Sequence, residues 1–236
     1  MLRNIGSMGQ DDDELTQQQA AVDLVRRRMI NVVGHELKTP VSALRGLADA
    51  MAGATDAELR SELAPAVARN AARLERLIDD LLVAAGVLTV LPSGTPRAEA
   101  VEPALDRAWH TVGDGRALEV TGDRSVSVLV HPDSLPRLLE LLLDNAVKYG
   151  EPPVRVEVRP SPGVVAVEIR AESAVSDADL ELAFEPFFRG EAAVTAAPGF
   201  GVGLPVARAL AEHDGGTLGL RRDGAVIVAR VELPGP

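Results

Sequence analysis

A histidine, a glutamate and a threonine lie close together in the stretch NVVGHELKTP, residues 31–40. Imidazole is nucleophilic near neutral pH, and a neighbouring carboxylate, here Glu36 beside His35, can orient the ring and accept its proton. Thr39 follows His35 by four residues, which places the two side chains on one face of a helix. Its hydroxyl could position a water molecule for hydrolysis. On spacing alone, the same residues could also form a solvated helix face, because a lone histidine on a helix is usually inert.

Apolar residues at helical spacing on both sides of this stretch predict one long helix from about Thr16 to Met51. The pattern consists of Val22, Val25, Met29, Val33, Val41, Leu44, Leu47 and Met51. Pro40 lies inside the run, where a proline removes a backbone hydrogen bond and costs about 3 kcal/mol. We therefore expect a loosened turn just beyond His35.

A second amphipathic helix is predicted after the turn AGATDAEL, in which Thr55 and Glu58 have the spacing of a capping box. Its apolar residues at helical spacing are Leu59, Leu63, Val67, Leu74, Leu77, Ile78 and Leu81. Pro65 interrupts the first half of this helix, which predicts a kink. Two such helices cannot bury their apolar stripes alone. They predict a homodimer in which the hairpins of two copies form a four-helix bundle.

The stretch GVLTVLPSGTPRAEA marks a boundary, beyond which the pattern becomes mixed α/β. The predicted organisation is a flexible tail at 1–15, a helical hairpin at 16–90, a linker at 91–100 and an α/β domain at 101–236. In this domain, helices are predicted at 102–112, at 133–150 and after GFGVG, and strands near 117–122 and 126–130. Two strand hairpins are predicted over 154–171 and 217–233, with SPG and RDG at their turns.

The composition excludes several classes of function. A net charge of −11 argues against direct nucleic-acid binding, which needs a basic footprint. The chain has no cysteine, so it can form no disulfide, thiolate nucleophile or thiolate metal site. No apolar run approaches the roughly 20 residues of a membrane span, and no signal peptide precedes the first helix. We expect a cytoplasmic protein.

The stretch GHELKTP resembles the phospho-acceptor box of two-component sensor histidine kinases, in which His-Glu is followed by a basic residue, Thr and Pro. The resemblance implies that His35 receives a phosphoryl group and that Glu36 is the activating acid/base. It implies that Thr39 supports phosphatase activity on a partner protein, and that Pro40 is the helix kink of the family.

The stretch LLLDNAVKYG resembles the asparagine box of the same family. The resemblance implies that Asn145 coordinates a magnesium ion that bridges the phosphates of ATP, and that Lys148 and Tyr149 face the phosphates and the adenine. Taken by itself, the stretch could equally be an amphipathic helix in which Asn145 and Lys148 face water.

Two more stretches follow in the order of the family. FEPFFRG resembles its phenylalanine-rich box, although ordinary core packing would also explain the aromatic residues. GFGVGLPVARALAEHDGG resembles its second glycine box, which implies that the nucleotide is bound by Gly199, Gly201, Gly203 and Leu204. Glycines let backbone N–H groups approach phosphates, and a helix N-terminus favours their charge. The implied fold is a dimerisation hairpin followed by a Bergerat-type α/β sandwich, as in gyrase and Hsp90-like ATPases.

One box of the family departs from the pattern. The family has Asp-x-Gly-x-Gly before the phenylalanine-rich box, and its aspartate accepts a hydrogen bond from adenine. In the corresponding stretch, EIRAESAVSDADLELAFEPF, either Arg170 or Ala171 takes the aspartate position, and Glu172 would serve only after a shift of register. Leu141 also replaces a usually polar residue. A missing charge-assisted hydrogen bond costs about 1.5–3 kcal/mol, or roughly ten- to a hundredfold in affinity.

The leading interpretation is a histidine kinase core that uses ATP and Mg²⁺, labels itself on His35 and passes the phosphoryl group to an aspartate of a response regulator. The alternative is a degenerate kinase that docks a response regulator, a separate sensor or a cognate kinase, or a phosphatase or phosphotransfer protein. ATP-dependent labelling of His35 distinguishes them. An anti-sigma-type serine kinase is disfavoured, because such proteins lack the HELKTP hairpin.

Overall fold

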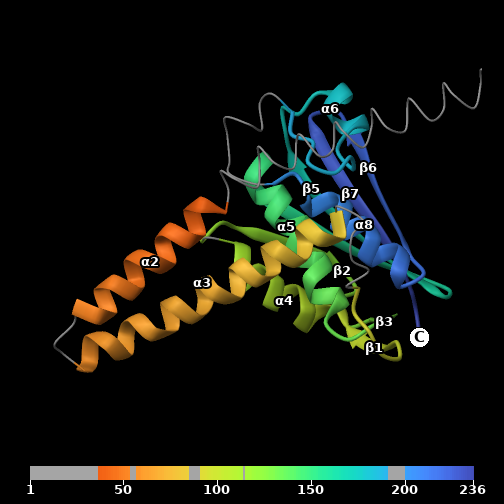
Figure 1. Ribbon diagram of the computed structural model, residues 1–236. Coiled ribbons are helices and arrows are strands. Elements are labelled where there is room, and N and C mark those ends of the chain that lie inside the picture. The colour runs from red at the N-terminus through yellow and green to blue at the C-terminus, as the bar shows by residue number, and fades with distance from the viewer. Residues whose placement is uncertain (1–36, 54–56, 85–90, 114, 191–199) are drawn as a thin grey trace, which may run out of the picture. The chain divides into compact units, whose positions relative to one another are not determined.

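The computed structural model describes residues 37–53, 57–84, 91–113, 115–190 and 200–236 (Figure 1). The chain divides into two compact units, Met1–Arg76 and Leu77–Pro236. His35, Glu36, Thr55 and Gly199 lie outside the described residues, as does the predicted helix before residue 37.

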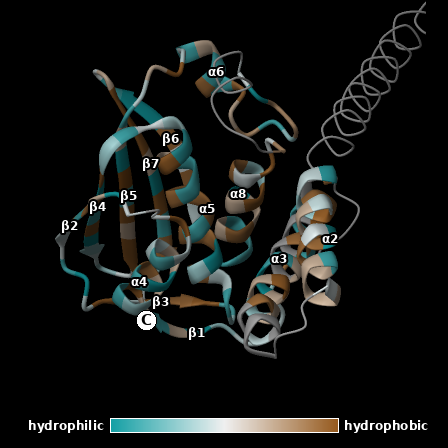
Figure 2. Cartoon of the chain, turned by 90° about the vertical axis from the view of Figure 1, so that its left-hand side faces the viewer, coloured by the Kyte–Doolittle hydropathy of each residue, from teal (hydrophilic) through white to brown (hydrophobic). Residues whose placement is uncertain are grey.

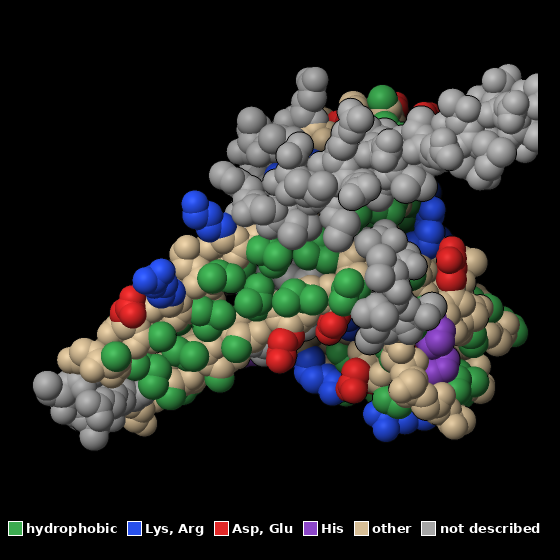
Figure 3. All heavy atoms as spheres, in the orientation of Figure 1, with side chains coloured by type: hydrophobic (Ala, Val, Ile, Leu, Met, Phe, Trp, Pro, Cys, Tyr) green, Lys and Arg blue, Asp and Glu red, His purple; other side chains and the backbone are tan. Residues whose placement is uncertain are grey.

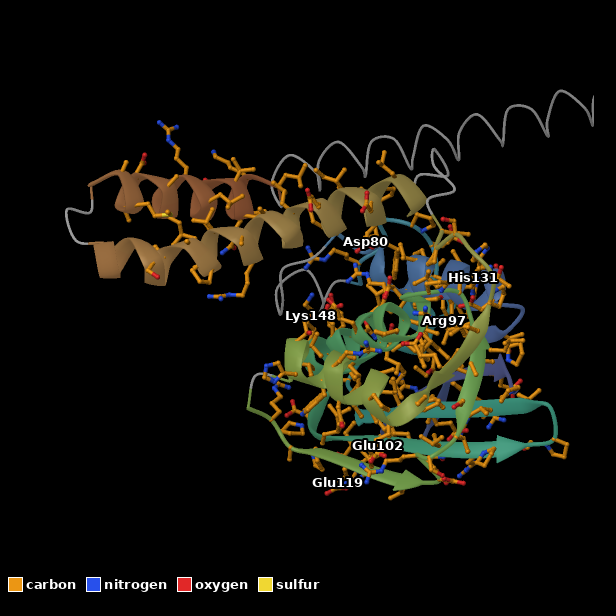
Figure 4. All side chains as sticks on the ribbon, turned by 90° about the horizontal axis from the view of Figure 1, so that it is seen from below. Asp80, Arg97, Glu102, Glu119, His131 and Lys148 are labelled. Atoms are coloured by element: carbon orange, nitrogen blue, oxygen red, sulfur yellow. The ribbon has the colours of Figure 1, made fainter. Side chains whose placement is uncertain are left out.

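The first unit contains a hairpin of two helices, α2 (Lys38–Gly53) and α3 (Ala57–Ala84). The last turns of α3 belong to the second unit. Figures 1 and 4 show α2 and α3 side by side. Pro65 lies inside α3 without ending it, and Pro40 lies in the first turn of α2 as described. No residue of α2 is buried, Val41 is 49% exposed, and hydrophobic side chains line the visible face of the hairpin (Figure 3). Apolar side chains of the described hairpin therefore remain accessible.

The second unit is built on a mixed five-stranded sheet with the strand order β2-β4-β5-β7-β6. These strands are β2 (Leu118–Gly122), β4 (Glu151–Ser161), β5 (Val164–Glu172), β6 (Thr217–Asp223) and β7 (Val226–Pro234). Only β2 and β4 pair in parallel; the other neighbours are antiparallel. A two-stranded sheet pairs β1 (Arg97–Ala100) with β3 (Ser127–Val130). The described helices of this unit are α4 (Val101–Val112), α5 (Ser134–Tyr149), α6 (Asp177–Glu181) and α8 (Gly203–His213).

The predicted helical hairpin and mixed α/β domain are confirmed, as are both strand hairpins and the helices over α4, α5 and α8. Two elements were not predicted. β1 lies in the predicted linker 91–100, and it forms by pairing with β3, about 30 residues away. α6 has five residues, too few to show a helical period.

The hydrophobic core lies between the sheet and the helices α4, α5 and α8, which cover one face of it (Figure 2). The strands alternate, so that every second residue faces this core. The fully buried core residues are mostly leucine and valine, among them Leu105, Leu135, Leu138, Leu139, Leu142, Val154, Val167 and Val231. Aliphatic packing therefore holds the α/β unit together, in keeping with an aromatic content of 3%.

The opposite face of the sheet carries a buried carboxylate surrounded by arginines. Glu168, in the middle of β5, has a side chain that is 2% exposed. It accepts hydrogen bonds from Arg170 and, at 2.8 Å, from Arg230, and Arg221 and Arg159 lie 3.7 and 3.8 Å away. Burial by itself would raise the pKa of Glu168, but the hydrogen bonds and the arginine charges outweigh it and hold the pKa at about 2.

Replacing Glu168 with glutamine should lower the free energy of unfolding by about 3 kcal/mol at pH 7, because the folded pKa of about 2 lies well below the ordinary 4.5. For a domain of this size, the melting temperature should fall by roughly 6–12 °C. This stabilisation is fully present above pH 4.5 and is lost as the pH falls toward 2, so the deficit of the variant should shrink on acidification. Thermal unfolding followed by circular dichroism at pH 7 and pH 3 measures both effects.

The matched control is Glu232→Gln. Glu232 pairs with Arg230 at 2.6 Å, but its side chain is 40% exposed. Exposed ion pairs contribute about 1 kcal/mol or less. Two results would contradict a stabilising role for the low pKa of Glu168. One is an equal loss of unfolding free energy in both variants, and the other is a loss in Glu168→Gln that does not change with pH.

Candidate functional site

Helix α5 presents Asn145 and Lys148 on its C-terminal turns. Its buried leucines pack against the sheet and the neighbouring helices, which fixes the rotation of the helix. Asn145 and Lys148 are both half-buried. The Lys148 ammonium lies 2.5 Å from a carboxylate oxygen of Asp144, one turn earlier (Figure 4). An amide side chain and an ammonium group therefore lie on one face at the end of this helix.

The N-terminal half of α5 is anchored within the same unit. Arg137 forms an ion pair with Asp80, on the last turns of α3, and a second one at 3.0 Å with Glu140. Burial raises the pKa of Asp80 above its ordinary value, although Arg137 opposes this shift. Arg137, Leu141 and Asn145 follow one another at intervals of four residues, so this ion pair lies on the same stripe of α5 as Asn145.

The start of α8 lies beside this stripe. A Cβ atom added at Gly203 would lie 3.8 Å from the Cδ2 atom of Leu141, one turn before Asn145. Leu141 is 8% exposed, and its packing against α8 explains an apolar residue at this position. The first turn of α8, which includes Leu204, carries no acidic residue. The backbone N–H groups of Gly203 and Leu204, together with the helix dipole, therefore favour a negatively charged ligand at this end, whereas Pro205 in the same turn has no N–H.

The two segments that flank residues 191–199 are bonded to each other. Phe187 donates its backbone N–H to the carbonyl oxygen of Gly201 at 2.9 Å. Gly201 has a φ of +68°, and a Cβ atom there would lie 2.4 Å from the carbonyl oxygen of Phe188, so only glycine fits. The Phe184 ring stacks under Arg208 of α8, with 3.3 Å between the guanidinium carbon and the ring centroid. These contacts fix the backbone that leads into α8.

The end of β5 puts the two candidate residues of the departing box on opposite faces of the sheet. Arg170 lies on the face opposite the helices, where it bonds to Glu168. Ala171, the next residue, faces the helices and is 6% exposed. A Cβ atom at Gly150, the C-cap of α5, would lie 2.4 Å from the Ala171 Cβ. Ala171 is therefore the residue of this strand end that adjoins the Asn145 helix.

The side chain of Glu172 faces away from the side of the sheet to which Ala171 points. It alternates to the face opposite Ala171, is exposed, and stands across from Glu151 and Val226 in the sheet. The hydroxyl of the following Ser173 donates a hydrogen bond to the carbonyl oxygen of Tyr149 at 2.7 Å. The end of β5 thus meets the end of α5 through Ala171 and Ser173.

The predicted residues Asn145, Lys148 and Tyr149 lie on the last turns of α5, whereas Gly201, Gly203 and Leu204 lie at or just before the start of α8, which adjoins Leu141, one turn before Asn145. Thr39 is exposed on α2, in the other unit. Sequence reasoning missed Asp144 and Ser173, which bond to Lys148 and to the Tyr149 carbonyl oxygen. Only Asp144 had a local signal, its spacing of four residues from Lys148.

These residues fit the phosphate and metal part of a magnesium nucleotide. Among the described residues, no group of three or more potential metal-ligating side chains occurs. A bound Mg²⁺ would need few protein ligands, because this ion keeps several waters and is held by one or two side chains and the phosphates of its ligand. The Asn145 amide oxygen can supply one ligand, and Lys148 and the α8 N-terminus can neutralise phosphate charge.

Within the described ranges, no helix has the length and apolar character needed to cross a bilayer.

Comparison with known proteins gives two family profiles, in the order of the two units. The profile described as "His Kinase A (phospho-acceptor) domain" matches residues 25–85, and "Histidine kinase-, DNA gyrase B-, and HSP90-like ATPase" matches residues 130–235.

Full-length relatives are longer than this chain. The sensor protein SphS of Synechococcus elongatus is 31% identical over 97% of this chain and 60% of its own length. The bacteriophytochrome of Pseudomonas aeruginosa is 30% identical over 91% of this chain and 30% of its own length. The chain therefore spans less than two thirds of either relative. Among solved structures, the histidine kinase AdeS of Acinetobacter baumannii is 20% identical over 85% of this chain and 98% of its own, with a TM-score of 0.53, which shows a shared fold.

Proposed function

The chain belongs to the sensor histidine kinases of two-component systems, and from this premise we propose that it uses Mg·ATP to phosphorylate itself on His35 and passes the phosphoryl group to an aspartate of a response regulator. One observation carries the proposal. The helix α5, which bears Asn145 and Lys148, adjoins the start of α8, and the first turn of α8 has no acidic residue. ATP as the donor places this activity in the cytoplasm.

The residues at the end of α5 and the start of α8 have separate roles in this proposal. Mg·ATP, when bound, supplies the γ-phosphoryl group. Asn145 holds the metal ion, Lys148 and the backbone around Gly201 and Gly203 bind the phosphates, and Tyr149 adjoins the base. Positioning and charge neutralisation, rather than covalent chemistry in the α/β unit, provide most of the catalysis.

The helical hairpin provides the acceptor. An imidazole nitrogen of His35 forms the bond to phosphorus while ADP leaves, and Glu36 accepts the ring proton. Thr39, exposed on α2, supports hydrolysis of the phosphorylated regulator by positioning water. The apolar stripe of the hairpin pairs with a second copy in a homodimeric four-helix bundle.

Incubation of the purified chain with Mg²⁺ and γ-labelled ATP tests the proposal. The expected result is a protein label that is stable in alkali, lost in acid and absent when EDTA is present, because a phosphorus–nitrogen bond is acid-labile. ATP labelled at the α-phosphate is the control and should leave no label. If the chain acquires no label at millimolar ATP, autokinase activity is ruled out, and a binding role for the hairpin is left.

A further inference from the structure

The segment that follows β5, residues 173–177, forms the side of the site next to the end of α5. Ser173 bonds to the Tyr149 carbonyl through its hydroxyl, and its N–H donates to the carbonyl oxygen of Ala225 at 3.0 Å. Ala225 belongs to the turn between β6 and β7. The segment is therefore held between the Asn145 helix and a hairpin about 50 residues further along the chain.

Arg222 makes two hydrogen bonds with this segment. In the sheet it stands in one row with Ile227 and Ala171, so its side chain projects from the helix-covered face. Its guanidinium group donates one hydrogen bond to the carbonyl oxygen of Val175 and another to the carboxylate of Asp177. The side chain is 28% exposed, whereas that of Asp177 is 79% exposed.

We propose that Arg222 is a positioning residue for the nucleotide site: it holds residues 173–177 in place before nucleotide binds, so that this wall of the site is preformed. The inference rests on the proposed function, and it adds a residue that touches neither the phosphates nor the metal. The segment 173–177 contains no glycine and has one internal hydrogen bond, from the Val175 N–H to the Ser173 hydroxyl at 3.4 Å, so contacts from outside contribute to its geometry.

The two bonds of Arg222 are not equivalent. The pair with Asp177 is exposed, and exposed ion pairs contribute little. The bond to the Val175 carbonyl is charge-assisted and partly buried, and it acts on the backbone directly. A lysine can supply the charge but not two donors in a planar fork. Arg222→Ala should therefore have a large effect, Arg222→Lys an intermediate one and Asp177→Asn a small one.

The neighbouring residue provides a matched control. Arg221 lies on the same strand but on the opposite face, where it pairs with Asp223 at 3.4 Å and lies 3.7 Å from Glu168. Arg221→Ala removes the same side chain without touching residues 173–177.

Two measurements on the full chain test the inference. Hydrogen exchange without nucleotide should be about tenfold faster at the amides of residues 173–181 in Arg222→Ala than in Arg221→Ala. Calorimetric titration with Mg·ATP should give a dissociation constant raised about tenfold in Arg222→Ala, and saturating ATP should restore the rate of autophosphorylation to within about twofold of the unsubstituted chain. Partial recovery in Arg222→Lys completes the expected result.

The outcomes separate this inference from the proposed function. If the unsubstituted chain binds no Mg·ATP, the proposed function fails, and Arg222 is left as a structural residue. If it binds Mg·ATP and Arg222→Ala binds equally well, the inference alone is overturned. Should Arg222→Ala prove unfolded by circular dichroism, Arg222→Lys carries the test, and wild-type exchange and affinity in that variant overturn the inference.

Discussion

Replacing His35 with alanine should abolish the acid-labile label completely while leaving Mg·ATP binding unchanged. The proposed reaction forms a bond between phosphorus and an imidazole nitrogen, and alanine offers no nucleophile at this position. Because the residues proposed to bind nucleotide lie on α5 and α8, removal of the acceptor should leave the affinity for Mg·ATP as it was. Labelling with γ-labelled ATP and calorimetric titration of the same preparation measure the two effects separately.

The chain contains four histidines, which provides a control. His110 is exposed near the end of α4, and His110→Ala should keep the full label. The other two are unsuitable, because the rings of His131 and His213 stack with centroids 4.2 Å apart and His131 bonds to the buried Asp214. A label that survives in His35→Ala would contradict the assignment of the acceptor.

Replacing Asn145 with alanine should weaken Mg·ATP binding by at least about a hundredfold, equivalent to about 3 kcal/mol. The change removes the one protein ligand proposed for the metal ion. Without this ligand, the charge of the ATP phosphates would be neutralised less well in a partly buried site. The label on His35 should disappear at micromolar ATP. Calorimetric titration with ATP, with and without Mg²⁺, measures the loss and its dependence on the metal.

A second helical asparagine serves as the control for this change. Asn70, on α3, donates only to the Ala66 carbonyl at 2.9 Å, one turn earlier. Asn70→Ala should therefore leave nucleotide affinity unchanged. If Asn145→Ala bound Mg·ATP with the affinity of the Asn70→Ala variant, the metal-binding role of Asn145 would be wrong.

The base side of the proposed site includes the stretch that departs from the pattern of the family. The resemblance left Arg170 and Ala171 as alternatives for the aspartate position, and the pleat of β5 puts them on opposite faces of the sheet. Arg170 points away from the helices to Glu168, and Ala171 packs at the end of α5. Neither the methyl group of Ala171 nor the guanidinium group of Arg170 can accept a hydrogen bond from adenine. The shape of this side of the proposed site then depends more on contacts such as the hydrogen bond from Arg222 to the Val175 carbonyl oxygen.

Short-range pattern in the sequence determined the elements and the local groups of residues. Period-two alternation located the hairpins β4–β5 and β6–β7, and helical spacing located α4 and α5. The same spacing placed Asn145 and Lys148 on one end of a helix, because residues three or four apart share a helix face wherever the helix lies. The order of four sequence boxes was enough to identify the family.

Only the tertiary structure decided which distant residues meet. The packing of Gly203 beside Leu141, the pairing of β1 with β3 and the reach of Arg222 to Val175 join residues about 30 to 60 positions apart. No local period encodes such contacts, because they depend on how the sheet orders its strands and on which face each side chain takes. The proposed acceptor and phosphate-binding residues were thus predicted from local chemistry, whereas the shape of the proposed site around the base depends on non-local packing.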